Sequence, residues 1–243
     1  MTMLQLGLIG VAVFAGAVIQ RLTGLGFAMV AAPLLTLVLG PFEGVLLANI
    51  LTFLLTFGMF IVTWRRAEPR RLALLVPAAI LAALAGAPLG RLIPSAWMLT
   101  ISGALVLGAL ILVMTMRHVR LFRGRIGALA AGAISGFMNA TSGVGGAAIT
   151  LYAMNISWEQ ASFYASMQVY LAVLNLASFL PKGLPHLGQA VGLVVVAALA
   201  LGFAGGHWLA RLVSLDWARK GAVCLALAGA AATLAKGVYQ MAG

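Results

Sequence analysis

Long apolar runs follow one another along almost the entire chain, and only short polar or glycine-rich stretches separate them. Ten runs can be delimited, at 4–19, 26–39, 43–63, 72–93, 97–116, 126–138, 145–154, 159–180, 187–210 and 217–238. A helix needs about 20 apolar residues to cross the hydrocarbon core of a bilayer. Six runs reach that length, and the four shorter runs flank two glycine-rich stretches. The pattern therefore predicts an all-α integral membrane protein that forms a polytopic helical bundle.

The two glycine-rich stretches, 20–26 and 139–145, align without a gap as an amide, two intervening residues, a hydroxyl residue and Gly-x-Gly. This alignment pairs Gly24 with Gly143 at an offset of 119 residues. A second set of matches has an offset of 120, and it pairs Gly86, Arg91 and Trp97 with Gly206, Arg211 and Trp217. A period this long indicates a duplication rather than a solenoid. We therefore expect a first repeat at 1–117, a basic linker at 118–125 and a second repeat at 126–243.

The distribution of basic residues predicts how the two repeats sit in the membrane. With five segments in each repeat, the second repeat would be inverted relative to the first. Lysine and arginine concentrate in the cytoplasmic loops of membrane proteins. One side of the predicted bundle receives Arg65, Arg66, Arg70, Arg71, Arg117, Arg120, Arg123, Arg125, Arg211, Arg219 and Lys220, whereas the other receives Arg91, Lys182 and Lys236. We therefore predict inverted-topology repeats in the cell inner membrane, with the basic side in the cytoplasm and both termini outside, in the periplasm.

The length of the apolar stretch around the second glycine-rich motif fits neither one transmembrane span nor two. Residues 126–158 carry no Asp, Glu, Lys or Arg, and these 33 residues are too many for one span and too few for two. We expect each repeat to contain a hairpin, in which one half-helix enters to mid-depth, breaks at the glycines and returns as a second half-helix, followed by three spanning helices. Whether the short segments are re-entrant or full spans is left open. Broken backbone at membrane depth is tolerated where it lines a cavity, and paired breaks in inverted repeats mark the binding site of secondary transporters.

Donor groups and glycines in and near the two motifs are the candidate substrate-binding residues. They are Gln20, Arg21, Thr23, Gly24, Gly26, Asn49, Asn139, Thr141, Ser142, Gly143, Gly145, Gly146 and Gln168. Free backbone amides at the start of a half-helix carry partial positive charge and bind anions. The two motifs would face each other, with Asn49 and Gln168, also 119 residues apart, across the site. The alternative interpretations are that the glycines only allow close helix packing and that the amides only bond neighbouring helices.

Charged residues within the apolar runs are rare, and their sign favours an anion. Arg21 lies between two apolar runs with no carboxylate close in sequence. A charge at membrane depth is costly and usually functional, so Arg21 is either a counter-charge for an anionic substrate or a side chain that snorkels to the interface. The four carboxylates, Glu43, Glu68, Glu159 and Asp216, lie at or near predicted loops. Cation transporters and proton relays normally need a carboxylate at depth, so we expect an anionic substrate.

Composition narrows the class of protein further. Hydrophobic residues make up 63% of the 243 residues and charged residues 8%, whereas a soluble domain has about 25% charged residues. The excess of 15 Lys and Arg over 4 Asp and Glu is explained by cytoplasmic loops, so no nucleic acid is expected as a partner. The sequence contains no nucleophile triad, metal-ligand spacing or phosphate-binding loop. We therefore expect that the protein is not an enzyme and that it binds no metal and no cofactor.

Residues 20–33, QRLTGLGFAMVAAP, and residues 139–146, NATSGVGG, followed by Tyr152, resemble the TauE/SafE family of sulfite and organosulfonate exporters. The resemblance covers essentially the whole chain, including its length and its two-half layout. It implies a permease that acts as a secondary transporter of sulfite, sulfoacetate or a related organosulfonate. One position departs from the family pattern, in which proline commonly follows the paired glycines, because Ala147 follows Gly146 here.

The function predicted from these observations is secondary transport of a small anion by alternating access, at a midplane site between the two broken hairpins. The alternatives are a membrane accessory subunit that transports nothing and an anion channel. The expected partners are the small anionic substrate and the lipid bilayer. Coupling to a proton or a sodium ion, assembly as a homodimer and the direction of transport are left open.

Overall fold

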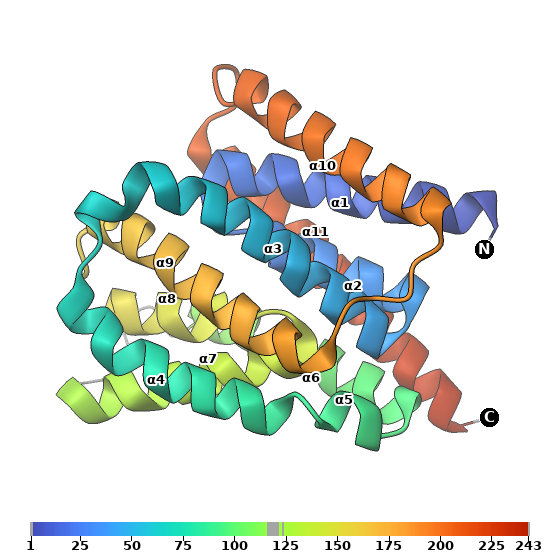
Figure 1. Ribbon diagram of the computed structural model, residues 1–243, viewed down its shortest axis with the longest axis horizontal. Helices are drawn as coiled ribbons and strands as arrows, with labels where there is room; N and C mark the ends of the chain where they lie inside the picture. Colours follow the sequence, from blue (N-terminus) through green and yellow to red (C-terminus); the bar gives the residue numbers. More distant parts are fainter. Residues whose placement is uncertain (1, 116–121, 123, 243) are drawn as a thin grey trace.

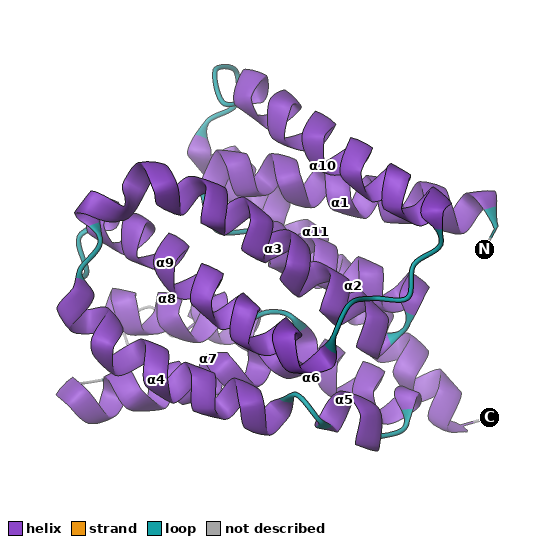
Figure 2. Cartoon of the chain, viewed as in Figure 1, coloured by secondary structure: helices purple, strands orange, loops and turns teal. Residues whose placement is uncertain are grey.

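The structure of the protein is a computed structural model that describes residues 2–115, 122 and 124–242. Helices account for all regular secondary structure in those residues (Figure 2). They are α1 (Met3–Thr23), α2 (Phe27–Leu39), α3 (Pro41–Thr63), η1 (Trp64–Arg66), α4 (Pro69–Gly86), α5 (Leu89–Leu92), α6 (Ser95–Thr115), α7 (Gly124–Ser142), α8 (Gly146–Asn155), α9 (Gln160–Phe179), η2 (Leu180–Lys182), α10 (Gln189–Leu209) and α11 (Leu215–Ala242). Among the described residues, each of the ten apolar runs contains a helix, so the predicted all-α bundle is confirmed.

Within the part of the chain that the structure describes, seven helical segments are long and apolar enough to cross a membrane, one more than the apolar runs predicted. The additional segment is α1, whose 21 residues include the start of the first glycine-rich motif. Helix α7 has 19 residues and likewise continues through Asn139–Ser142. The first arm of the first hairpin is therefore long and apolar enough to span the membrane, whereas α7 is longer than its apolar run but is not among the seven candidate spans. The hydroxyl residues of each motif bond back into the helix, so the helix is interrupted only at the glycine that follows.

Local sequence signals account for several helix ends. Thr2 and Gln5 form a reciprocal capping box at the start of α1. Gly40 has a φ of +87° and separates α2 from α3. Pro41 then occupies the first turn of α3, where a missing N–H costs nothing. The single apolar run at 72–93 is divided between α4 and the short helix α5.

Successive long helices run back and forth along the bundle, and the two termini lie at the same end, called here the terminal end (Figure 1). The connections after α3, α8 and α10 lie at the opposite end, called here the basic end. Apart from Arg21 in the last turn of α1, the described basic residues of this end are Arg65, Arg66, Arg70, Arg71, Arg125, Arg211, Arg219 and Lys220. Those of the terminal end are Arg91, Lys182 and Lys236. Arg117, Arg120 and Arg123 lie outside the described residues, and a cytoplasmic location of the basic end stays a prediction.

The most extensive packing joins helices from different halves of the chain. Helix α4 packs along α7, α1 along α10, α3 along α9, and α6 along α11. Glycines allow the closest approaches, because a methyl group on Gly136 would lie 2.0 Å from the Ala79 carbonyl oxygen, and one on Gly202 would lie 2.6 Å from the Phe14 carbonyl oxygen. The two larger clusters of the buried core lie among α1, α2, α3, α6, α10 and α11 and among α4, α7, α8 and α9.

Candidate functional site

The backbone between α1 and α2 leaves the helix at Gly24, which has a φ of +76°. The buried side chain of Gln20 bridges this break. Its Oε1 accepts hydrogen bonds from the backbone amides of Gly26 and Phe27, at 2.9 and 3.0 Å, and its Nε2 donates to the Gly24 carbonyl oxygen at 3.0 Å. Gln20 therefore caps α2, and it occupies the Gly26 amide, which the sequence suggested as an anion donor, and the neighbouring Phe27 amide.

Helix α9 covers the first break with two side chains. Gln168 is fully buried and donates from Nε2 to the Gly24 carbonyl oxygen at 3.0 Å. The ring of Tyr164 lies against the α-carbon of Gly24, since a methyl group there would come within 1.7 Å of the ring. Thr23 donates its hydroxyl proton back to the Ile19 carbonyl oxygen at 2.8 Å. Only glycine fits at position 24, because both the positive φ and the tyrosine ring exclude a side chain.

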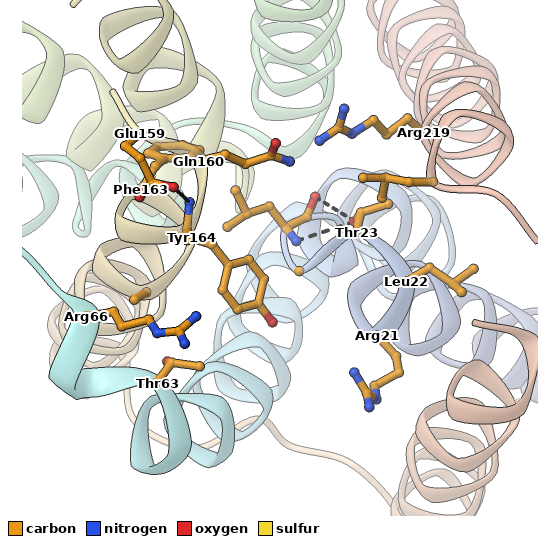
Figure 3. Close-up of a pocket in the computed structure, with 15 residues that line it drawn as sticks. Arg21, Leu22, Thr23, Thr63, Arg66, Glu159, Gln160, Phe163, Tyr164 and Arg219 are labelled. Atoms are coloured by element: carbon orange, nitrogen blue, oxygen red, sulfur yellow. Dashed lines mark hydrogen bonds between the residues drawn. The ribbon is translucent and has the colours of Figure 1, made fainter. Parts of the chain in front are cut away.

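A cavity of about 620 Å³ opens beside this break at the basic end (Figure 3). Its polar and charged lining comes from α1, α3 with η1, α9 with the residue before it, and α11, and comprises Arg21, Thr23, Thr63, Arg66, Glu159, Gln160, Tyr164 and Arg219. Three guanidinium groups and one carboxylate thus surround the space. The balance of these charges makes the lining positive.

Glu159 offsets only one of the three positive charges at the cavity, and its carboxylate also caps α9. Its carboxylate accepts hydrogen bonds from the backbone amides of Ala161 and Ser162, at 3.0 and 2.7 Å, and so caps the helix. These backbone hydrogen bonds hold the pKa of Glu159 below its ordinary value. The carboxylate is therefore ionised at neutral pH and engaged by the start of α9, while the arginines remain available.

Arg21 projects from the last turn of α1 and reaches α10. Its Nη2 lies 2.9 Å from Nδ1 of His207, and its Cζ lies 5.7 Å from the centre of the Phe203 ring. A guanidinium group is permanently protonated and only donates, so His207 accepts through an unprotonated Nδ1. Within the described residues Arg21 forms no ion pair with a carboxylate. Its charge is therefore uncompensated at the cavity wall.

The second break, between α7 and α8, is enclosed. Gly143 has a φ of +75° and is buried. Asn139 is also buried, and its Nδ2 donates to Asn175 Oδ1 and Ser178 Oγ of α9, at 3.2 and 2.9 Å. Asn49 of α3 donates from Nδ2 to the Asn139 carbonyl oxygen at 3.5 Å. The polar groups of the second motif therefore hold neighbouring helices together in the described conformation.

The two breaks lie at different depths in the bundle. Gln168 contacts the first break and Asn175 the second, and the seven residues that separate them on α9 correspond to about 10 Å of helix. The expectation that the two glycine-rich motifs face each other is therefore corrected. The physical reason is that α1 and α7 run in opposite directions, and each crosses much of the bundle before it breaks (Figure 1).

Three of the candidate binding residues, Arg21, Thr23 and Gly24, line the cavity. The other candidates lie at the two breaks or on helices that contact them, and they are Gln20, Gly26, Asn49, Asn139, Thr141, Ser142, Gly143, Gly145, Gly146 and Gln168. The hydroxyls of Thr141 and Ser142 donate to carbonyl oxygens of their own helix, as that of Thr23 does.

Six polar or charged residues of the cavity were not predicted as site residues, and they are Thr63, Arg66, Glu159, Gln160, Tyr164 and Arg219. Arg66 and Arg219 were counted only as loop charges, because nothing in their local sequence shows that α3 and α11 bring them to the same space. Tyr164 had no signal in the repeat, since the offset of 119 pairs it with Val45. Its role at Gly24 becomes visible only when α9 is packed against the first break.

Comparison with known proteins identifies the family. The sequence model of the family described as Sulfite exporter TauE/SafE matches residues 8–233. The chain belongs to the TauE/SafE family. No curated protein and no solved structure matches the chain. The resemblance seen in the two glycine-rich motifs is thus confirmed, and this TauE/SafE protein is a multi-pass membrane protein of a transporter family rather than of an enzyme family.

Proposed function

We propose that this TauE/SafE protein is a secondary transporter that moves a small sulfur-containing anion, such as sulfite, sulfoacetate or another organosulfonate, out across the cell inner membrane. The observation that carries the proposal is the cavity at the basic end, where Arg21, Arg66 and Arg219 from three helical segments surround the break at Gly24. The description of the family as sulfite exporters supports both the substrate class and the outward direction.

The chemistry of the cavity fits an anion with several acceptor oxygens. A guanidinium group presents five N–H donors in a planar fork that matches oxyanions. Thr23 and Tyr164 also line the cavity, but their hydroxyls already donate to the Ile19 carbonyl oxygen and to Met59 Sδ, so the arginines are the donors that face an anion. A cleft with charges of one sign and low-dielectric walls concentrates ions of the opposite sign. With the basic end in the cytoplasm, the cavity would gather small anions from that side and repel cations.

Alternating access requires the far end of the bundle to be closed while this cavity is open. At the terminal end, Lys182 donates from Nζ to the Ala140 carbonyl oxygen at 2.5 Å, and Arg91 donates to the Lys182 carbonyl oxygen at 2.8 Å. The Cζ of Arg91 also lies 5.0 Å from the centre of the Phe42 ring. These contacts join α7, η2, α5 and α3, so under the proposal the described conformation is the inward-facing state.

Reciprocal contacts between the two halves support inverted repeats as the moving parts. The sequence alignment pairs α1 with α7 and α4 with α10, so the packing of α4 on α7 matches that of α10 on α1. Asn49 donates to the Asn139 carbonyl oxygen, and its counterpart Gln168 donates to the Gly24 carbonyl oxygen. The side-chain oxygens of both amides are buried without a hydrogen-bond partner. Rocking one repeat against the other would exchange the environments of the two breaks.

Thermal unfolding of the purified protein in detergent tests whether the cavity binds an anion. A ligand that binds only the folded protein raises the unfolding midpoint. At constant ionic strength, sulfite, sulfoacetate and short sulfonates should raise the midpoint, whereas amines and neutral sugars should not. Arg21→Gln should abolish the increase, and Arg65→Gln, which alters an exposed arginine outside the cavity lining, should retain it. Stabilisation by amines or metal cations and by no anion would contradict the proposal.

A further inference from the structure

Lys182 is a buried cation that the proposed transport site does not use. It lies in η2, the turn that follows α9 at the terminal end, and its exposed fraction is 6%. Its ammonium group donates to the Ala140 carbonyl oxygen in the last turn of α7. No carboxylate forms an ion pair with it among the residues that the structure describes. A buried charge without a counter-ion is costly in a membrane protein and usually serves a function.

The alignment of the two halves relates Lys182 to the cavity at the basic end. The offset of 119 residues pairs Ala140 with Arg21 and Lys182 with Thr63. Arg21 and Thr63 both line the cavity, and Ala140 and Lys182 are in direct contact. The two positions are therefore in contact in the second half and line one cavity in the first half, and each half carries one cation on them. In the first half the cation is Arg21, at the position that matches Ala140. In the second half it is Lys182, at the position that matches Thr63.

We propose that Lys182 is the anion-binding cation of a second site, which takes the same class of small anion at the terminal end when the transporter opens to that side. This inference rests on the proposed function. The site is closed in the described conformation, because the Ala140 carbonyl oxygen engages the ammonium group and Arg91 holds the Lys182 carbonyl oxygen. Opening would separate η2 from the end of α7, and an anion would replace the carbonyl oxygen as the acceptor.

A lysine at this place could serve only to cap a helix, because cations interact favourably with the carbonyl groups at a helix C-terminus. Lys236 makes such a contact at the same end of the bundle, where its Nζ donates to the Leu37 carbonyl oxygen of α2 at 2.7 Å. Lys236 is less buried than Lys182. The two lysines share their residue type, their end of the bundle and their kind of acceptor, so Lys236 is the matched control.

Transport measured separately from the two faces distinguishes an anion site from a helix cap. The protein is reconstituted in proteoliposomes of uniform orientation, and sulfite is presented at either face. Lys182→Gln keeps a donor for the Ala140 carbonyl oxygen and removes the charge. We expect it to raise KM for sulfite at the terminal face about tenfold or more, because a charged hydrogen bond to the anion is lost. KM at the basic face should stay unchanged, and Lys236→Gln should change KM at neither face.

Chemical restoration of the charge provides a second test that does not depend on one variant. Lys182→Cys is combined with Cys224→Ser and treated with aminoethyl methanethiosulfonate, which attaches a side chain that ends in an ammonium group. Methyl methanethiosulfonate, which attaches a neutral group, is the control. The cysteine variant should show the raised KM at the terminal face, and only the charged reagent should lower it again.

Three results would overturn the second site: equal increases of KM at both faces in Lys182→Gln, a lower unfolding midpoint with an unchanged KM, or equal restoration by the neutral reagent. Each of them would leave Lys182 as a cap of α7 and would leave the proposed function intact. Absence of sulfite flux in the unaltered protein would instead contradict the proposed function, so the two failures are distinguishable.

Discussion

Gln168 of α9 donates a hydrogen bond to the carbonyl oxygen of Gly24 at 3.0 Å, across 144 residues of sequence. Gln20 of α1 donates to the same oxygen, also at 3.0 Å. The Gly24 carbonyl is therefore a junction between the two halves of the chain, and it lies at the wall of the cavity. Substitutions around this junction test whether it positions the cavity or binds the solute.

Replacing Gln168 with leucine removes one of the two donors to the Gly24 carbonyl oxygen. We expect Gln168→Leu to lower the free energy of unfolding by about 1 kcal/mol, the usual size of one hydrogen bond. The turnover of sulfite should fall because the halves are less firmly joined, while KM should stay near that of the unaltered protein. Unfolding measurements and proteoliposome transport check these two expectations. A large increase in KM at full turnover would place Gln168 in the substrate site instead.

Glycine at position 24 should be indispensable. In Gly24→Ala the new methyl group would lie 1.7 Å from the Tyr164 ring, and the backbone would keep a φ of +76°. The steric clash and the positive φ together should lower the free energy of unfolding by at least about 2 kcal/mol. Gly146→Ala is the matched control, since a methyl group there meets no atom within 4 Å and φ is not positive. Equal effects of the two substitutions would contradict the packing of Tyr164 on Gly24.

The lowered pKa of Glu159 predicts that the stability of the folded protein depends on pH, and it fixes the sign of that dependence. The folded-state pKa lies below the ordinary value because the backbone amides of Ala161 and Ser162 bind the carboxylate. The stability contributed by this cap is therefore present above the ordinary pKa of a glutamate and is lost as the pH falls through the folded-state pKa. The unaltered protein should unfold at a higher temperature than Glu159→Gln at neutral pH, and the difference should vanish in acid. Thermal unfolding of both proteins across pH measures it.

The same substitution should strengthen anion binding, because it removes the negative charge from the lining of the cavity. We expect Glu159→Gln to lower the Kd for ethanesulfonate by about two- to fivefold at neutral pH and low salt, an effect that salt would screen. Ethanesulfonate is the suitable probe because its charge does not change over this pH range. Weaker binding in Glu159→Gln would show that the carboxylate helps to hold the ligand.

The sequence predicted the helices well because each apolar run is long and bounded by polar or turn residues. It also located both breaks, since Gly24 and Gly143 are the residues with positive φ in the two motifs. The lengths of α1 and α7 were underestimated because the apolar runs were ended before the polar residues Gln20 and Asn139. Both side chains are compatible with a helix when neighbouring groups satisfy them.

The candidate site was predictable only in part. Arg21 was identified because an unpaired charge between apolar runs is costly, and it lines the cavity. Gln20 was expected to bind solute, yet its partners are the backbone amides of Gly26 and Phe27. A sequence motif does not reveal whether an amide bonds the backbone or a ligand. The contact of Tyr164 with Gly24 and the position of Arg219 in the cavity lining likewise depend on long-range packing, which no local pattern encodes.

The central claim is that the protein transports an anion by alternating access, and counterflow of sulfite in proteoliposomes tests it most directly. Vesicles are loaded with unlabelled sulfite, and a trace of radiolabelled sulfite is added outside. A carrier exchanges the two, so the label should accumulate transiently inside against its gradient, the initial rate should saturate with sulfite concentration, and Arg21→Gln should abolish the accumulation. A flux that rises linearly without accumulation would indicate a channel, and no flux at all would indicate a subunit that transports nothing. Either result would contradict transport by alternating access.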